Sequence, residues 1–166
     1  MRLRNYLVEG LSGTGKTTVA EELQRRGFQV VHGDRELTYQ GDPQSGEPVS
    51  GASHEHHIWS VQRVRELVEN HDRTLTFFCG GSRNFHAFID LFDEVFVLEV
   101  DLQTLRQRLD ARTSEDWGAG GAPEFARVAR WHATGSDVPR NGIPIDATAS
   151  IERVVDAILE RVERSR

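Results

Sequence analysis

The sequence predicts an α/β fold, a three-layer α/β/α sandwich around a parallel sheet of about five strands. Short, largely apolar runs alternate with helical patterns, and they cover residues 5–8, 28–31, 75–79, 95–100 and 143–145. Runs that are apolar throughout, rather than at every second residue, are typical of strands buried on both faces of a parallel sheet. Helices must link such strands through right-handed crossovers, so we expect helices on both faces.

The length and composition predict a single globular domain covering residues 1–166. No apolar run approaches the length needed to span a membrane, and the first strand begins so early that we expect no signal peptide. Cys79 is the single cysteine, so no internal disulfide can form, which fits a cytoplasmic location. The net charge of −6 argues against a nucleic-acid partner. The chain is expected to be a monomer or a homodimer.

The stretch between the first predicted strand and the first predicted helix carries the clearest chemistry. Residues 10–17, GLSGTGKT, have the form G-x-x-x-x-G-K-[ST], which is the phosphate-binding loop. Val19, Ala20 and Leu23 follow at helical spacing, and Gly27 is placed to end that helix. A strand, a loop and a helix in this order are the setting in which the motif binds a nucleoside triphosphate.

Each residue type in this loop has a physical role. The glycines let successive backbone N–H groups point at phosphate oxygens, and the start of the following helix adds its dipole. Lys16 would contact the β- and γ-phosphates, and the Thr17 hydroxyl would bind Mg²⁺. ATP and Mg²⁺ are therefore the expected ligands, and the residues predicted to bind ATP here are Gly10, Ser12, Gly13, Thr14, Gly15, Lys16, Thr17 and Thr18.

A second group of polar residues follows the second predicted strand. Parallel strands end at the same edge of a sheet, so Asp34 should face the γ-phosphate together with the loop. A carboxylate there can position or deprotonate an acceptor hydroxyl, or hold Mg²⁺ through water, and we predict Asp34 as a catalytic, substrate-binding and metal-binding residue. Arg35 is a candidate for binding an anionic group of the substrate.

The third predicted strand ends in Cys79-Gly80-Gly81-Ser82-Arg83, without a carboxylate. The glycines resemble the Gly-Gly-Gly turn of shikimate kinase, and this resemblance implies that Gly81 brings bare backbone to the substrate. By its position at the edge of the sheet, Arg83 would contact a phosphate or carboxylate group. Cys79 is expected to be a small buried hydrophobic residue.

Capping residues predict three further helices. Ser53 should begin a helix that buries Ile58, Val61, Val64 and Leu67 or Val68. Asp101 should begin a helix that buries Leu102, Leu105 and Leu109. Ser150 should begin the last helix. The stripe of the last helix is core packing and predicts no function. Residues 41–52 and 114–123 are glycine-rich, and each is either a surface connection or a segment that closes over a binding site.

Histidines cluster in residues 53–59, SHEHHIW. His54 and His57 could share one helix face, but two histidines without a clear third ligand make a weak case for zinc. Exposed residues at a helix start and contact with the substrate both remain open, and His57 is the candidate for that contact. Trp59 could stack on a ring of the substrate or pack inside the protein.

On these motifs the chain resembles the small-molecule kinase branch of the phosphate-loop proteins: nucleoside and nucleoside monophosphate kinases, shikimate kinase, gluconate kinase and adenylylsulfate kinase. Residues 105–112, LRQRLDAR, resemble the L-x-x-R-L-x-x-R pattern before the lid of these kinases. The resemblance implies that Arg108 stacks on adenine and that Arg112 is catalytic and reaches the transferring phosphate. It also implies an acceptor-binding region at about 35–70, a short lid at about 113–127, and an adenine slot completed by residues 142–148.

The expected activity is ATP-dependent transfer of a γ-phosphoryl group to a small-molecule acceptor. The sequence favours a nucleoside- or nucleotide-like acceptor over shikimate, gluconate or an antibiotic, by a small margin. The alternatives from other classes are a nucleotide-binding regulatory ATPase that transfers nothing to a small molecule, and a regulatory GTPase. The sequence lacks the Asn-Lys-x-Asp element that reads guanine, which argues against the GTPase.

Overall fold

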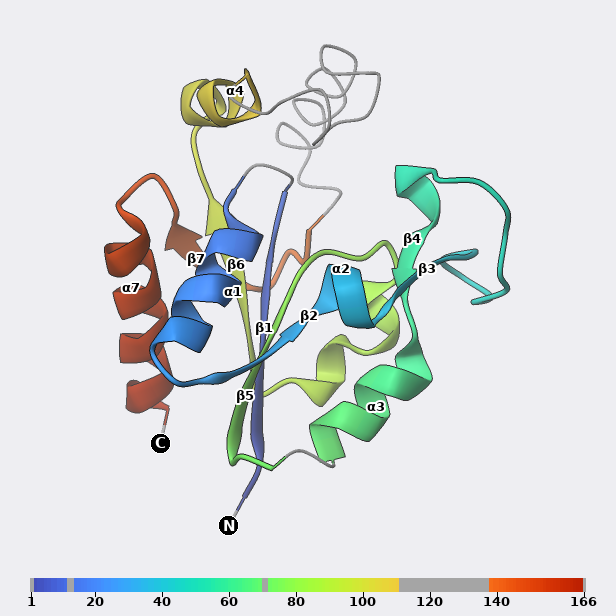
Figure 1. Cartoon of the computed structure of the whole chain (residues 1–166), viewed down its shortest axis with the longest axis horizontal. Coiled ribbons are helices and arrows are strands. Elements are labelled where there is room, and N and C mark those ends of the chain that lie inside the picture. The colour runs from blue at the N-terminus through green and yellow to red at the C-terminus, as the bar shows by residue number, and fades with distance from the viewer. Residues whose placement is uncertain (1, 12–13, 70–71, 111–137, 166) are drawn as a thin grey trace.

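A parallel sheet of five strands forms the centre of the molecule (Figure 1). The computed structural model describes residues 2–11, 14–69, 72–110 and 138–165, with the side chains of 109 and 110 excepted. The strands are β1 (Arg4–Gly10), β2 (Gln29–His32), β5 (Leu75–Cys79), β6 (Glu94–Glu99) and β7 (Ile143–Asp146). Their order is β2-β5-β1-β6-β7, and every neighbouring pair is parallel. All five predicted strands are therefore confirmed.

Helices cover both faces of this sheet, as the sequence predicts (Figure 1). Alternate residues of the central strand separate two apolar cores: Tyr6 and Val8 belong to one, and Leu7 to the other. The first core is closed by α1 (Lys16–Arg25) and α7 (Ile151–Arg164), and the second by α3 (Val61–Glu69). A strand buried on both faces is apolar at most positions, which explains the continuous runs in the sequence.

Local signals place the ends of several helices correctly. At the end of α1, Gly27 has a φ of 95°, its N–H binds the Gln24 carbonyl, and the Phe28 N–H binds that of Leu23. This pair of bonds is the Schellman motif, in which glycine takes the left-handed conformation at no steric cost. Ser150 caps α7 by accepting a hydrogen bond from the Arg153 N–H.

Helix α4 (Leu102–Asp110) follows β6 and confirms the predicted cap but not all of the predicted burial. The Thr104 N–H donates to the Asp101 carboxylate over 2.6 Å. Leu105 is fully buried, whereas Leu102 is 45% exposed, so its predicted burial is wrong. Leu102 occupies the first turn of the helix, where helical spacing alone misassigned it. The side chain of Leu109 lies outside the described residues.

The prediction of a helix that begins at Ser53 is wrong for the first half of that helix. Ser53 caps only a 3₁₀ turn (His54–His56), which is followed by the short strand β4 (His57–Trp59), and α3 starts after Ser60. Strand β4 pairs antiparallel with β3 (Thr38–Gln40), with Tyr39 opposite Ile58. Ile58 is buried as predicted, but in a strand, because β-branched and aromatic residues gain more from strand pairing here than from a helix.

Residues 41–52 form a hydrogen-bonded turn beyond β3. Gly41 bridges to Pro48, and the Tyr39 hydroxyl donates to the Gly46 carbonyl over 2.7 Å. No helix within the described parts of the chain is long and apolar enough to cross a membrane.

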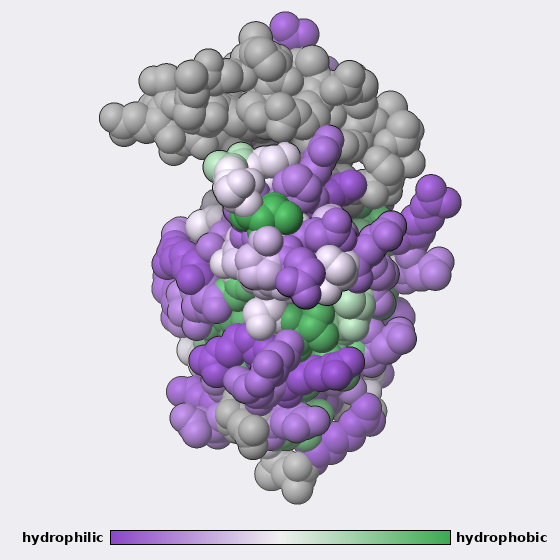
Figure 2. Space-filling model, turned by 90° about the vertical axis from the view of Figure 1, so that its right-hand side faces the viewer, coloured by the Kyte–Doolittle hydropathy of each residue, from purple (hydrophilic) through white to green (hydrophobic). Residues whose placement is uncertain are grey.

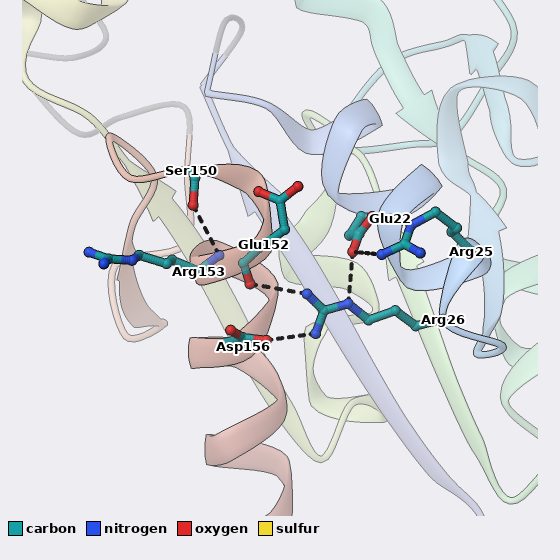
Figure 3. Close-up of polar contacts among 7 residues, drawn as sticks. All are labelled: Glu22, Arg25, Arg26, Ser150, Glu152, Arg153 and Asp156. Atoms are coloured by element: carbon teal, nitrogen blue, oxygen red, sulfur yellow. Dashed lines mark hydrogen bonds and ion pairs between the residues drawn. The ribbon is translucent and has the colours of Figure 1, made fainter.

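A polar network ties α1 to α7 (Figure 3). The Arg26 guanidinium donates to the Glu22 carboxylate over 2.8 Å, to that of Asp156 over 2.7 Å and to the Glu152 carbonyl over 3.2 Å. Arg25 adds two further bonds to Glu22. The C-terminal end of α1, the helix that starts at the phosphate loop, is thus linked to α7, the last helix of the chain.

Candidate active site

The described residues of the loop between β1 and α1 fit a phosphate-binding loop. Gly15, directly before α1, has a φ of 102°, a conformation that favours glycine. A side chain at Gly10 would stand 2.6 Å from the Thr14 hydroxyl oxygen and 3.1 Å from the Leu98 carbonyl oxygen, so only glycine fits. Thr14 closes the turn through a 2.7 Å bond to the Leu11 carbonyl. Ser12 and Gly13, also predicted to bind ATP, lie outside the described residues.

One side of the loop opens into a cavity of about 330 Å³, which we call the α7-side cavity. Arg108 lines this cavity, and its guanidinium donates to the Thr14 carbonyl over 3.1 Å and to the Ala147 carbonyl over 2.5 Å. These two bonds bring together the predicted ATP-binding arginine and the loop after β7. The lining residues are Thr14, Gly15, Thr18, Val19, Arg108, Ala147, Ala149, Ile151 and Val154.

The other side opens into a smaller cavity of about 160 Å³, the α2-side cavity. It gathers residues from five places in the sequence at the carboxyl edge of the sheet, where parallel α/β folds bind ligands. It joins Lys16 with three predicted substrate residues besides Asp34, namely His57, Gly81 and Arg83. The full lining is Glu9, Gly10, Lys16, Asp34, His54, His57, Gly81, Ser82 and Arg83.

Asp34 belongs to the short helix α2 (Gly33–Glu36) and pairs with His57 from β4. The two side chains meet at 3.2 Å between His57 Nε2 and Asp34 Oδ1. Partial removal of water from the Asp34 carboxyl raises its pKa, but the His57 hydrogen bond and the positive charge of Lys16 outweigh this effect. The pKa of Asp34 therefore lies below its ordinary value, and the group is a carboxylate at neutral pH.

Sequence reasoning missed two polar residues of the α2-side cavity, Glu9 and Ser82. Glu9 is the penultimate residue of β1 and is only 2% exposed, and Ser82 is 4% exposed in the loop after β5. The sequence did contain a signal for Glu9: a charged residue that directly follows the apolar residues Tyr6, Leu7 and Val8 of the central strand reaches the ligand edge of the sheet. Ser82 carried no comparable signal.

Trp59 is buried in the protein interior and does not line this cavity. Its ring is 1% exposed and stacks on Phe88, with centroids 5.4 Å apart and planes 4° apart. The buried Asn84 amide holds the Trp59 backbone on both sides, accepting from its N–H over 3.0 Å and donating to its carbonyl over 2.9 Å. Of the two open interpretations of Trp59, packing inside the protein is confirmed.

A third, small cavity of about 30 Å³ brings the two predicted metal ligands, Thr17 and Asp34, to one place. A hydroxyl and a carboxylate are oxygen donors of the kind that Mg²⁺ prefers, with phosphate and water completing its octahedron. The residues present therefore fit Mg²⁺. Arg35 lines this small cavity rather than the α2-side cavity. The described residues contain no group of three or more histidines, cysteines and acids arranged to hold a metal ion.

Other predictions on this part of the chain have mixed outcomes. Cys79 is buried, and burial raises the pKa of its thiol, as expected for a structural cysteine. Arg112, predicted to reach the transferring phosphate, and the lid at about 113–127 lie outside the described residues.

The surface on the β3–β4 side is largely hydrophilic, with small separate apolar areas (Figure 2).

The sheet order and the glycine-rich loop define a P-loop protein, a class of proteins that binds nucleotides. The model of the AAA_18 family, described as an AAA domain, matches residues 7–124, and the chain belongs to this family. No curated protein matches the chain in sequence.

Solved structures of several kinases share the fold at low sequence identity. A gluconokinase from Sinorhizobium meliloti 1021 is 16% identical with a TM-score of 0.62, covering 99% of this chain and 94% of its own. A shikimate kinase from Bacteroides thetaiotaomicron is 15% identical with a TM-score of 0.65, covering 96% and 98%. A deoxyadenosine kinase from M. mycoides is 16% identical with a TM-score of 0.55, covering 98% and 100%. The sheet order is typical of P-loop kinases, so the predicted fold class and resemblance are confirmed.

Proposed function

We propose that this protein is a kinase that transfers the γ-phosphoryl group of Mg·ATP to a small-molecule acceptor. One observation carries the proposal: the phosphate loop separates two cavities, with Thr14 and Gly15 lining the α7-side cavity and Lys16 lining the α2-side cavity. A triphosphate that follows the loop has its adenosine end in the first cavity and its γ-phosphate at the mouth of the second. The proposal treats residues 1–166 as one domain, with its acceptor region at about 35–70 and its lid at about 113–127.

Arg108 supports the assignment of adenosine to the α7-side cavity. Its two bonds to backbone carbonyls fix the guanidinium plane between the phosphate loop and the loop after β7. A fixed guanidinium stacks on an aromatic ring at a small entropic cost, because its rotamer is already set. Ala147 and Ala149 supply small apolar walls on the opposite side.

The α2-side cavity contains the groups that phosphoryl transfer to an acceptor needs. Bound Mg·ATP supplies the phosphoryl group and neutralises part of the charge on its oxygens. Lys16 stabilises the charge that remains, and the Asp34 carboxylate, oriented by His57, accepts the hydrogen bond of the acceptor hydroxyl. The acceptor oxygen forms its bond to phosphorus as the bond to the ADP oxygen breaks, and the hydroxyl proton passes to Asp34 and then to water. Thr17 and Asp34 would hold Mg²⁺, the carboxylate through water.

The test is ADP formation from ATP with pooled acceptors: nucleosides, nucleoside monophosphates, shikimate, sugar acids and aminoglycosides. Acceptor-dependent ADP formation that falls at least about 100-fold in both Lys16→Ala and Asp34→Asn supports the proposal. ADP formation that is equally fast without acceptor would identify an ATPase and overturn it. A preference for GTP over ATP in a competition assay would overturn it in favour of a GTPase.

A further inference from the structure

The side chains around the α2-side cavity are hydrophilic on every side that the structure describes. Two carboxylates, Glu9 and Asp34, face two cations, Lys16 and Arg83, and no aliphatic, phenyl or indole side chain lines the space. Trp59, the nearest large ring, is buried in its stack with Phe88. Pockets that hold a drug-sized ligand are usually about 300–1,000 Å³ and mainly apolar, whereas this one has about 160 Å³. A nucleobase would find little room here, and the rings among the described lining residues are the imidazoles of His54 and His57.

Glu9 is set to receive a hydroxyl group next to Lys16. A methyl group on Gly81 would stand 2.9 Å from Glu9 Oε1 and 3.3 Å from Lys16 Nζ, so the carboxylate and the ammonium both lie close to the Gly81 backbone, on the same side of the cavity. A group that binds to both of them must donate to a carboxylate and accept from an ammonium. An alcohol does both, whereas a phosphate or carboxylate oxygen would be repelled by Glu9.

Ser82 adds an independent observation. It lines the same cavity, is 4% exposed, and its Oγ has no hydrogen-bond partner among the described residues. Buried hydroxyl groups in native proteins almost always have a partner, and leaving one unpaired is unfavourable. A ligand that carries further hydroxyl groups would supply that partner.

We infer that the acceptor is a small polyhydroxylated molecule, such as a sugar, an alditol or a sugar acid, bound through hydroxyl groups to Glu9, Asp34 and Ser82. This inference rests on the proposed kinase function and names the substrate class of the same site. It departs from the nucleoside- or nucleotide-like acceptor that the sequence favours. Arg83 in the lining can pair with the carboxylate of a sugar acid, while the lining carboxylates Glu9 and Asp34 disfavour a nucleoside monophosphate whose phosphate is the acceptor.

The experiment compares two acceptor classes in one assay. ADP formation is followed with monosaccharides, alditols and aldonic acids in one arm, and with nucleosides and nucleoside monophosphates in the other. We expect turnover in the first arm only. Glu9→Gln should lower kcat/KM for that acceptor about 10- to 100-fold, which is the effect of losing one hydrogen bond to a charged group. Glu160→Gln, an exposed position on α7, is the matched control and should leave kcat/KM unchanged.

Thermal shift by Mg·ATP separates folding and nucleotide binding from acceptor binding. The shift should be equal in wild type, Glu9→Gln and Ser82→Ala, whereas the further shift on adding the polyol should be lost or reduced in both variants. If Glu9→Gln fails to fold, the smaller change Ser82→Ala carries the test. Turnover with nucleosides alone would overturn the acceptor class while leaving the kinase function standing. ATP hydrolysis that no acceptor of either arm accelerates would overturn both.

Discussion

At the scale of single residues, the contact between His57 and Asp34 joins two segments that are far apart in the sequence. Asp34 was recognisable by its position after a strand, but its hydrogen bond to His57 depends on strand β4. The bond lowers the pKa of Asp34 against the opposing effect of burial. We therefore propose His57 as a positioning residue for the carboxylate.

Removing this contact should change the pH profile in a defined direction. His57→Ala removes a hydrogen bond that stabilises the carboxylate, so the pKa of Asp34 rises and the acid limb of kcat/KM moves to higher pH. We expect about a 10-fold loss at neutral pH as well, since the carboxylate loses its orientation. His57→Gln, which can still donate an N–H, is the control and should retain more activity. An acid limb that stays in place in His57→Ala would contradict this role.

Gly33 is a second residue whose role is visible only in three dimensions. A methyl group there would stand 2.6 Å from Cε2 of the Trp59 ring, which is fully buried and cannot move away. We expect Gly33→Ala to lower the free energy of unfolding by about 1–3 kcal/mol, measured by urea denaturation. In a double-mutant cycle with Trp59→Phe, the combined loss should be smaller than the sum of the two single losses. A Gly33→Ala variant as stable as wild type would show that the Trp59 ring is not tightly packed against Gly33.

At the scale of elements, the fastening of α1 to α7 determines how firmly the phosphate-loop helix is held. Two arginines bind the Glu22 carboxylate and lower its pKa to about 2 (Figure 3). A carboxylate with a lowered pKa in the folded state stabilises the protein above its unfolded pKa of about 4.3, and this contribution disappears as the pH falls toward 2.

Glu22→Gln should therefore have a lower Tm than wild type at neutral pH, by a few degrees. The difference should shrink between about pH 4.3, the ordinary pKa of glutamate, and pH 2, where Glu22 itself becomes protonated. Thermal unfolding followed by circular dichroism across this range is the measurement. Glu160→Gln on the exposed side of α7 should show no such dependence. A Tm difference that is constant with pH would mean that the ion pairs do not contribute.

At the scale of the whole molecule, the two cavities meet at the phosphate loop, so ligand binding should stabilise the entire domain. Saturation at about 100 times Kd adds about 2.7 kcal/mol to the free energy of unfolding, which corresponds to a rise in Tm of roughly 5–10 °C for a chain of this size. Differential scanning fluorimetry with Mg·ATP measures this rise. EDTA and Lys16→Ala should each remove most of it. An equal rise in Lys16→Ala would place nucleotide binding elsewhere on the protein.

The sequence by itself determined the features that depend on local signals. Continuous apolar runs located the five strands, and the motif located the phosphate loop. Gly27, Asp101 and Ser150 marked helix ends because capping bonds connect near neighbours. Even Asp34 followed from a general rule, that parallel strands bring their carboxyl ends to one edge.

Tertiary structure alone decided which residues far apart in the sequence contact one another. Strand β4 replaced the first half of a predicted helix because Ile58 and Trp59 meet β3 and Phe88, contacts that no local pattern contains. Glu9 and Ser82 became parts of one cavity because β1 and β5 are neighbours in the sheet although about 70 residues separate them in the chain. The α2-side cavity is built from such long-range contacts, whereas the phosphate loop is contained in one short segment. That difference explains why the sequence predicts nucleotide binding more firmly than it predicts an acceptor.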